Sequence, residues 1–171
     1  MKNITASIQA RLRNLARQEK KDFVLVSRLY MQEGILRRIE SSKYAESFCL
    51  KGGLLLYSIS GFKSRPTMDI DLLGLNIPRD EEQFRTILSD ILSIELEDGL
   101  SFDIQTMNLR EIVEGVDYRG QRLKVLCRLG PMKTNLKLDI GFWGYNLSRS
   151  CRDGLPDTLG YRIIQDLSLL T

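Results

Sequence analysis

Residues 48–74, "FCLKGGLLLYSISGFKSRPTMDIDLLG", carry the most informative pattern in the chain. A short apolar run ends at Lys51 and two glycines follow, after which the sequence predicts a helix from near Gly53. The segment "MDIDLLGL" predicts the next strand, with Pro66 just upstream, where a proline removes no ladder hydrogen bond. The stretch therefore predicts two strands joined by a short helix.

Two carboxylates share one face of the second predicted strand. Residues two apart on a strand lie on the same face, so Asp69 and Asp71 point one way. Met68, Ile70 and Leu72 are then expected to face the core. Two adjacent carboxylates repel, and each raises the pKa of the other. A Mg²⁺ ion between them would remove that conflict, because hard oxygen ligands suit it; a solvated strand end is the simpler alternative.

A third carboxylate lies on the polar side of the strand predicted by "NLKLDIGFWG", residues 135–144. The strict alternation places Leu136, Leu138 and Ile140 on one face and Asp139 on the other. If this strand lies beside residues 68–73, three carboxylates converge. Such a cluster is typical of two-metal phosphoryl or nucleotidyl transfer.

Lys51, Gly52 and Gly53 lie between the first strand and its helix. Two glycines let a phosphate approach the backbone, and a helix N-terminus offers unpaired N–H groups. Lys51 adds a positive charge. An ordinary turn is the alternative for these residues alone, because the phosphate-binding motif GxxxxGK[ST] is absent.

The rest of the chain predicts an α+β fold with a mixed sheet flanked by helices. Helices are expected at 5–19, at 20–42 with Asp22 as N-cap, and at 78–96. Residues 100–109 and parts of 111–129 predict strands, with a hairpin bend at Gly120. We expect one domain over 1–171, with N-terminal helices in 1–44, a sheet core in 45–145 and a C-terminal remnant in 146–171.

Composition narrows the function. The chain has no histidine, which excludes Ser-His-Asp and Cys-His catalysis, histidine zinc sites and a histidine base. No stretch approaches the ~20 apolar residues of a membrane span, so no membrane partner is expected. Three widely spaced cysteines without a CxxC indicate reduced thiols and a cytoplasmic location. Arg119, Arg122 and Lys124 could line a nucleic-acid groove or form a solvated basic turn.

Residues 48–74 resemble the signature of the AbiEii/AbiGii toxin family of nucleotidyltransferase-like proteins, which carries a strand ending in KGG, a helix and an R-x-[ST]-x-D-[IL]-D-L segment. The resemblance continues in "LEDGLSFD" (96–103), "VDYRGQRLKV" (116–125) and "LKLDIGFWG" (136–144). It implies a DNA polymerase β-like nucleotidyltransferase fold. It also implies a toxin of a bacterial toxin–antitoxin or phage-abortive system, whose antitoxin is a separate transcriptional repressor.

The resemblance also implies roles for individual residues. Asp69, Asp71 and Asp139 would be the catalytic carboxylates and the ligands of Mg²⁺. Gly52 and Gly53 would hold the triphosphate of an NTP. Lys51, Arg65 and Thr67 would complete the nucleotide site, and the acceptor would be an RNA, tRNA ends in particular.

One departure leaves the activity open. Family members continue past the third carboxylate into a helical half with a lysine motif, which residues 146–171 match only loosely. The chain is therefore expected to be either a nucleotidyltransferase or a truncated, non-catalytic module that binds a nucleotide or a partner. A Mg²⁺-dependent nuclease is a third hypothesis. An apolar face left open could pair with a second copy.

Overall fold

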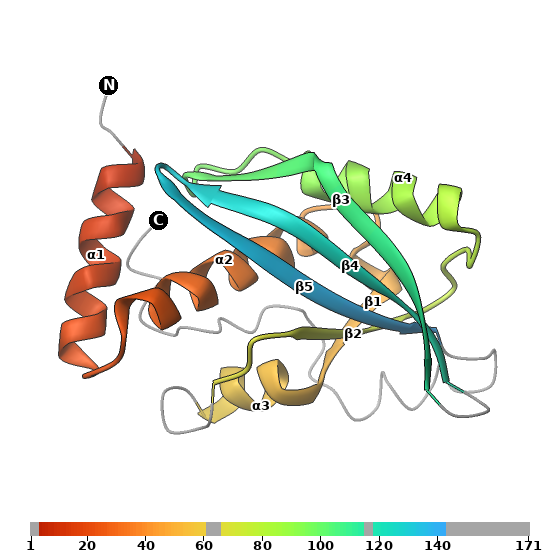
Figure 1. Ribbon diagram of the computed structural model, residues 1–171, viewed down its shortest axis with the longest axis horizontal. Helices are drawn as coiled ribbons and strands as arrows, with labels where there is room; N and C mark the ends of the chain where they lie inside the picture. Colours follow the sequence, from red (N-terminus) through yellow and green to blue (C-terminus); the bar gives the residue numbers. More distant parts are fainter. Residues whose placement is uncertain (1–3, 61–65, 115–117, 143–171) are drawn as a thin grey trace.

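A computed structural model of the chain describes residues 4–60, 66–114 and 118–142, except for the side chains of 114, 118 and 119. Four α-helices and one five-stranded sheet make up this part of the chain, with a short 3₁₀ turn (Ala45–Ser47) before the first strand. The helices α2 and α4 lie behind the long strands in Figure 1, and α1 lies at one end. The opposite face of β3, β4 and β5 carries none of these helices.

Two helices begin the fold, as the periodicity predicts. Helix α1 (Ile4–Gln18) is amphipathic and buries residues such as Leu12 and Leu15. Helix α2 (Phe23–Glu40) begins at Asp22, whose carboxylate accepts hydrogen bonds from the backbone N–H groups of Val24 and Leu25. This confirms the predicted N-cap. Because α2 packs against α1, α4 and strand β5, it is buried over most of its surface.

The five strands form one mixed sheet in the order β1-β2-β5-β4-β3. Strands β1 (Phe48–Lys51) and β2 (Ile70–Gly74) are antiparallel, and β2 runs parallel to β5 (Met132–Phe142). Strands β3 (Leu100–Glu114), β4 (Tyr118–Leu129) and β5 are antiparallel neighbours. The predicted α+β class, the mixed sheet and the two N-terminal helices are confirmed.

Helix α3 (Gly52–Ser60) joins β1 to β2, and helix α4 (Glu81–Leu92) follows β2. The carboxylate of Asp80 caps α4 by accepting from the N–H of Gln83 at 3.0 Å. Residues such as Phe84, Leu88 and Ile91 make the buried stripe of α4. The sequence predicted both helices, with α3 starting near Gly53 and α4 over 78–96, which is three residues longer at its start and four at its end than observed.

The bend predicted at Gly120 is wrong. Gly120 lies inside β4, paired with Ile112 on one side and with Gly141 on the other. A Cβ atom at residue 120 would lie 2.7 Å from the carbonyl oxygen of Ile140, so the close approach of β5 requires glycine there. The glycine therefore marks tight strand packing and not a turn.

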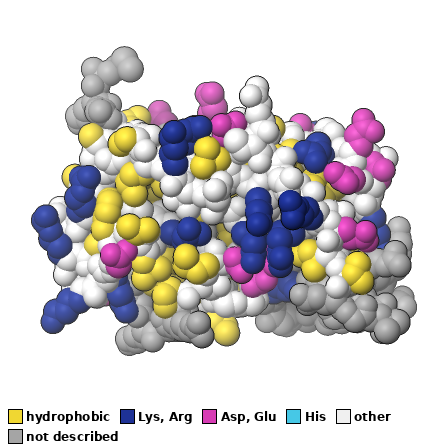
Figure 2. All heavy atoms as spheres, viewed as in Figure 1, with side chains coloured by type: hydrophobic (Ala, Val, Ile, Leu, Met, Phe, Trp, Pro, Cys, Tyr) yellow, Lys and Arg dark blue, Asp and Glu magenta, His cyan; other side chains and the backbone are white. Residues whose placement is uncertain are grey.

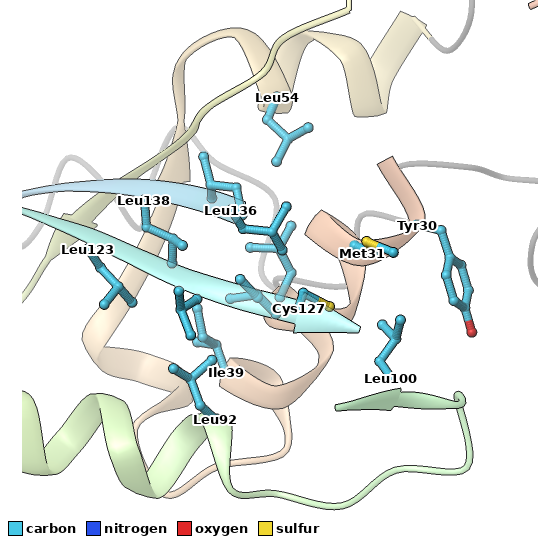
Figure 3. Close-up of a cluster of buried hydrophobic side chains, with 14 of the residues drawn as sticks. Tyr30, Met31, Ile39, Leu54, Leu92, Leu100, Leu123, Cys127, Leu136 and Leu138 are labelled. Carbon is cyan, nitrogen blue, oxygen red and sulfur yellow. The ribbon is translucent and has the colours of Figure 1, made fainter. Parts of the chain in front are cut away.

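The core lies between the sheet and the helices. The inward residues of β4 and β5 alternate along each strand and meet side chains of α2, α3 and α4 (Figure 3). Leu123, Cys127, Leu136 and Leu138 are fully or almost fully buried. This alternation leaves the odd-numbered residues Lys133, Asn135, Lys137 and Asp139 of β5 on the face without helices.

Ion pairs to the buried Asp98 tie α2 to the start of β3, the longer of them from Arg37 at 3.5 Å. Arg38, which is 1% exposed, donates to both carboxylate oxygens of Asp98, at 2.7 and 3.1 Å. The same guanidinium donates to the carbonyls of Gly34 and Leu100. The hydroxyl of Tyr30 donates to the carbonyl oxygen of Asp98 at 2.8 Å. The charges are therefore compensated inside the core.

Several large apolar side chains stay exposed, among them Leu56 and Ile59 on α3 and Met68 before β2. Pairing with a second copy stays a prediction. The single-domain assignment over 1–171 also stays a prediction, and the expected C-terminal remnant at 146–171 lies outside the described residues.

Candidate active site

Asp71 and Asp139 are direct neighbours on two parallel strands. In the register of β2 and β5, Asp71 is opposite Asp139. The flanking pairs, Ile70 with Leu138 and Leu72 with Ile140, are buried in the core. Because side chains alternate along both strands, the two carboxylates lie together on the other face of the sheet.

Asp69 precedes β2 and does not belong to it. The strand begins at Ile70, and the ladder with β5 begins there too. Met68 is 52% exposed, so the expectation that it faces the core is wrong. The chain bends before the strand, where the hydroxyl of Thr67 donates to the carbonyl of Asp69 at 3.3 Å, and alternation begins only once the ladder holds the backbone.

Two cations hold two of the three carboxylates. Arg122 on β4 donates from Nε and Nη2 to the two oxygens of Asp139, both at 2.7 Å. The Nζ of Lys137 lies 2.6 Å from Oδ2 of Asp69. The hydrogen bonds from Arg122 lower the pKa of Asp139, although partial burial opposes them. Asp139 is therefore ionised and fixed in orientation at neutral pH.

The pKa of Asp71 moves the other way. Burial raises it first, and the charges of Asp139 and Asp69 raise it further, while Lys51 and Lys137 oppose the rise. Asp71 is thus a partly buried carboxylate whose negative charge is disfavoured by burial and by its two acidic neighbours. An additional cation at this place would relieve it.

A glycine corner faces Asp71. Gly52 begins α3 with a φ of +70°, and a Cβ there would collide with Oδ2 of Asp71. A Cβ on Gly53 would lie 3.2 Å from the Cβ of Thr67. Lys51 is opposite Asp71 in the β1–β2 register. The N-terminus of α3 therefore opens directly onto the carboxylates, and its first N–H groups could bind phosphate oxygens.

Replacing Gly52 by alanine is expected to destabilise the fold by about 1–2 kcal/mol, because a left-handed residue acquires a Cβ. The same Cβ should push Asp71 out of place and weaken NTP binding. Urea unfolding and titration with a fluorescent NTP measure the two effects. Wild-type stability and wild-type NTP affinity in Gly52→Ala would contradict the geometry.

Replacing Arg122 by glutamine is expected to raise the pKa of Asp139 toward the ordinary aspartate range, because hydrogen bonds from Arg122 are the largest cause of its lowering. Carbon-13 NMR titration of the Asp139 carboxyl group measures this. Lys124→Gln removes a neighbouring cation on the same strand and should leave the midpoint almost unchanged. An unmoved midpoint in Arg122→Gln would mean that the contact is absent in solution.

Comparison with protein-family models identifies the family of this chain. The model described as "Nucleotidyl transferase AbiEii toxin, Type IV TA system" matches residues 34–145, roughly two thirds of the chain. The chain belongs to the AbiEii family. The matched residues include all five strands together with α3 and α4, whereas α1 precedes them. No curated protein matches the chain.

The AbiEii match establishes the class of the domain. It is a nucleotidyl transferase toxin domain of the type IV toxin–antitoxin kind, which implies a nucleotide substrate and an antitoxin partner. The observed α+β architecture with its mixed sheet agrees with a nucleotidyltransferase-like fold. None of the described helices is both long and apolar enough to cross a bilayer.

The donor chemistry of this candidate site fits Mg²⁺. Asp69, Asp71 and Asp139 offer carboxylate oxygens only, which Mg²⁺ prefers, and the charges of Asp69 and Asp139 add to the burial that raises the pKa of Asp71. Within 4–60, 66–114 and 118–142, no three acidic or thiol side chains are grouped as a metal site as they stand. The prediction that the three carboxylates share a cation stays a prediction.

Two residues of the candidate site were not assigned to it from the sequence. Arg122 was assigned either to a nucleic-acid groove or to a solvated basic turn, and Lys137 was not singled out. Lys137 could have been found, because it precedes Asp139 by two residues on an alternating strand and must share its face. Arg65, expected at the phosphates, lies outside the described residues, as does the side chain of Arg119.

Proposed function

We propose that this AbiEii protein is a Mg²⁺-dependent toxin that transfers the nucleotidyl group of an NTP to a hydroxyl of an RNA and releases pyrophosphate, with tRNA ends as the expected acceptor. The observation that carries the proposal is the pairing of Asp71 with Asp139 beside the glycine corner at Gly52. Transfer needs a polyphosphate site and carboxylates next to one another, and these residues supply both.

The side chains and backbone divide the work. The N–H groups of Gly52 and Gly53 and the charge of Lys51 bind the triphosphate, with Thr67 beside them and Arg65 as a further proposed phosphate ligand. Asp69, Asp71 and Asp139 would hold Mg²⁺, which supplies Lewis-acid stabilisation of the attacking and leaving oxygens when bound. Arg122 keeps Asp139 ionised and oriented.

Lys137 is proposed to exchange partners. It lies against Asp69 and shares a face with Asp139, so it can neutralise either a carboxylate or a phosphate oxygen brought to the site.

The proposed antitoxin is a separate transcriptional repressor, and the proposed location of the toxin is the cytoplasm.

Binding without turnover is the second candidate function. It is favoured by the contacts of Arg122 with Asp139 and of Lys137 with Asp69, because these ion pairs compete with any metal for the same oxygens. A module of this kind would bind a nucleotide or a partner and transfer nothing.

The test incubates purified protein with each α-labelled NTP, Mg²⁺ and total RNA, and measures label in RNA. Wild-type protein should label RNA, and Asp69→Ala should not, while both keep the same circular dichroism spectrum. Nucleotide binding with no label in RNA would replace the enzyme by the non-catalytic module. RNA shortening without label would instead indicate a nuclease.

A further inference from the structure

Like charges face one another across the open side of the sheet. In the strand register Arg110 is opposite Arg122, Lys124 is opposite Lys137, and Arg128 is opposite Lys133. Directly opposed like charges destabilise strand pairing, so the stability of the sheet does not explain them. Figure 2 shows Lys and Arg side chains gathered near the middle of this face, with acidic side chains beside them.

Four of these cations lie beyond the site already described. We call Arg110, Lys124, Arg128 and Lys133 the basic track. Lys124, Lys133 and Arg110 are exposed and form no ion pair with a described residue, whereas Arg128 contacts Asp103 at 3.2 Å. The whole chain has a net charge of only +3, so this local excess of positive charge is a feature of the face.

The basic track leads to the carboxylates. Lys133, Asn135, Lys137 and Asp139 follow one another on the same face of β5, about 6.8 Å apart at each step. From Lys133 to Asp139 the distance along the strand is therefore about 20 Å. On the neighbouring strand β4, Lys124 and Arg128 lie opposite Lys137 and Lys133. Regularly spaced cations suit successive phosphates of an extended strand.

We propose that the basic track binds the phosphate backbone of the acceptor RNA and directs one end of it toward Asp71 and Asp139. This inference rests on the proposed function for its choice of RNA. A protein partner fits the face less well, because lysine is depleted at protein interfaces and the four residues offer no aromatic anchor. Lys, Arg and Asn side chains are the usual contacts to phosphates.

The test measures binding without catalysis. A fluorescein-labelled single-stranded RNA of about 12 nucleotides is titrated with the protein in EDTA, without NTP, at a series of KCl concentrations. This length lies within the range of binding-site sizes of single-strand-binding proteins. Each phosphate contact contributes about −0.7 to the slope of log K against log salt. The double variant Lys124→Gln/Lys133→Gln should therefore bind RNA more weakly, and its salt dependence should be less steep, with a slope closer to zero by about 1.4.

The control variant is Lys43→Gln/Arg79→Gln, which removes the same charge beside α4, where Lys43 pairs with Asp90. It should keep the wild-type affinity and slope. If both double variants bind RNA alike, or the wild-type protein does not bind it at low salt, the proposal is overturned. Tighter binding of DNA of the same sequence, or of polyglutamate of equal charge, would overturn the assignment to RNA.

Labelling of RNA separates this inference from the proposed function. Track-dependent RNA binding without any transfer would keep the basic track and reject the enzyme. Transfer with an unchanged salt slope in Lys124→Gln/Lys133→Gln would keep the enzyme and reject the track.

Discussion

Replacing Asp71 by asparagine is expected to reduce nucleotide transfer by about 10³-fold or more, because a carboxylate at the proposed Mg²⁺ site becomes a neutral amide. Asp71 is the central member of the site, opposite both Lys51 and Asp139 in the sheet and in contact range of the Gly52 corner. Incorporation of labelled NTP into RNA at saturating Mg²⁺ measures the loss.

The same variant should be as stable as the wild-type protein or more stable. Because burial raises the pKa of Asp71, its ionised form costs stability at neutral pH, and this cost disappears as the pH falls through the raised pKa. Asparagine removes it at every pH. The difference in urea midpoint between variant and wild type should therefore shrink on acidification.

Asp90→Asn is the matched control, since it changes an exposed carboxylate on α4 that pairs with Lys43 and Tyr44. It should transfer nucleotide at the wild-type rate. Full transfer by Asp71→Asn would reject the proposed site. Loss of transfer together with loss of fold would contradict the predicted stability.

The largest stability change is expected from the buried pair of Arg38 and Asp98. Replacing Asp98 by asparagine leaves the Arg38 guanidinium in the core without its counter-charge, which should cost about 3–5 kcal/mol. For a protein of this size the melting temperature should then fall by on the order of 10 °C. Urea unfolding with an unchanged m-value would establish the loss as one of stability.

A double variant separates the pair from its surroundings. Arg38→Met/Asp98→Asn should be less destabilised than the sum of its single variants, because no unpaired charge is left buried. Lys43→Met changes a solvent-exposed pair and should leave the midpoint unchanged within error. Additive effects of Arg38→Met and Asp98→Asn would show that the two groups do not interact in solution.

Most of the fold could be predicted from the sequence, because the helices and strands follow from patterns of neighbouring residues. The cap at Asp22, the stripe of α4 and the alternation in β5 each depend on consecutive residues. The prediction failed at Gly120, where the glycine allows close approach of the neighbouring strand β5 and does not form a turn. It also failed at Met68, because the alternation was extended to residues that precede the start of β2.

The candidate site divides in the same way. Its carboxylates and glycines could be named from the sequence, since their residue types and spacing carry the chemistry. The cation that binds Asp139 could not be assigned in this way. Arg122 reaches Asp139 only because β4 pairs with β5 in one register, and a shift of one residue would turn it into the core.

Local patterns are enough to locate most helices and strands, to exclude histidine chemistry and to place Asp139 on the polar side of its strand. The pairing of Asp139 with Asp71 and the contact of Arg38 with Asp98 follow instead from the packing of distant segments. Periodicity is a property of neighbours along the chain. Register between distant strands is set by how the whole core packs, and no local pattern contains it.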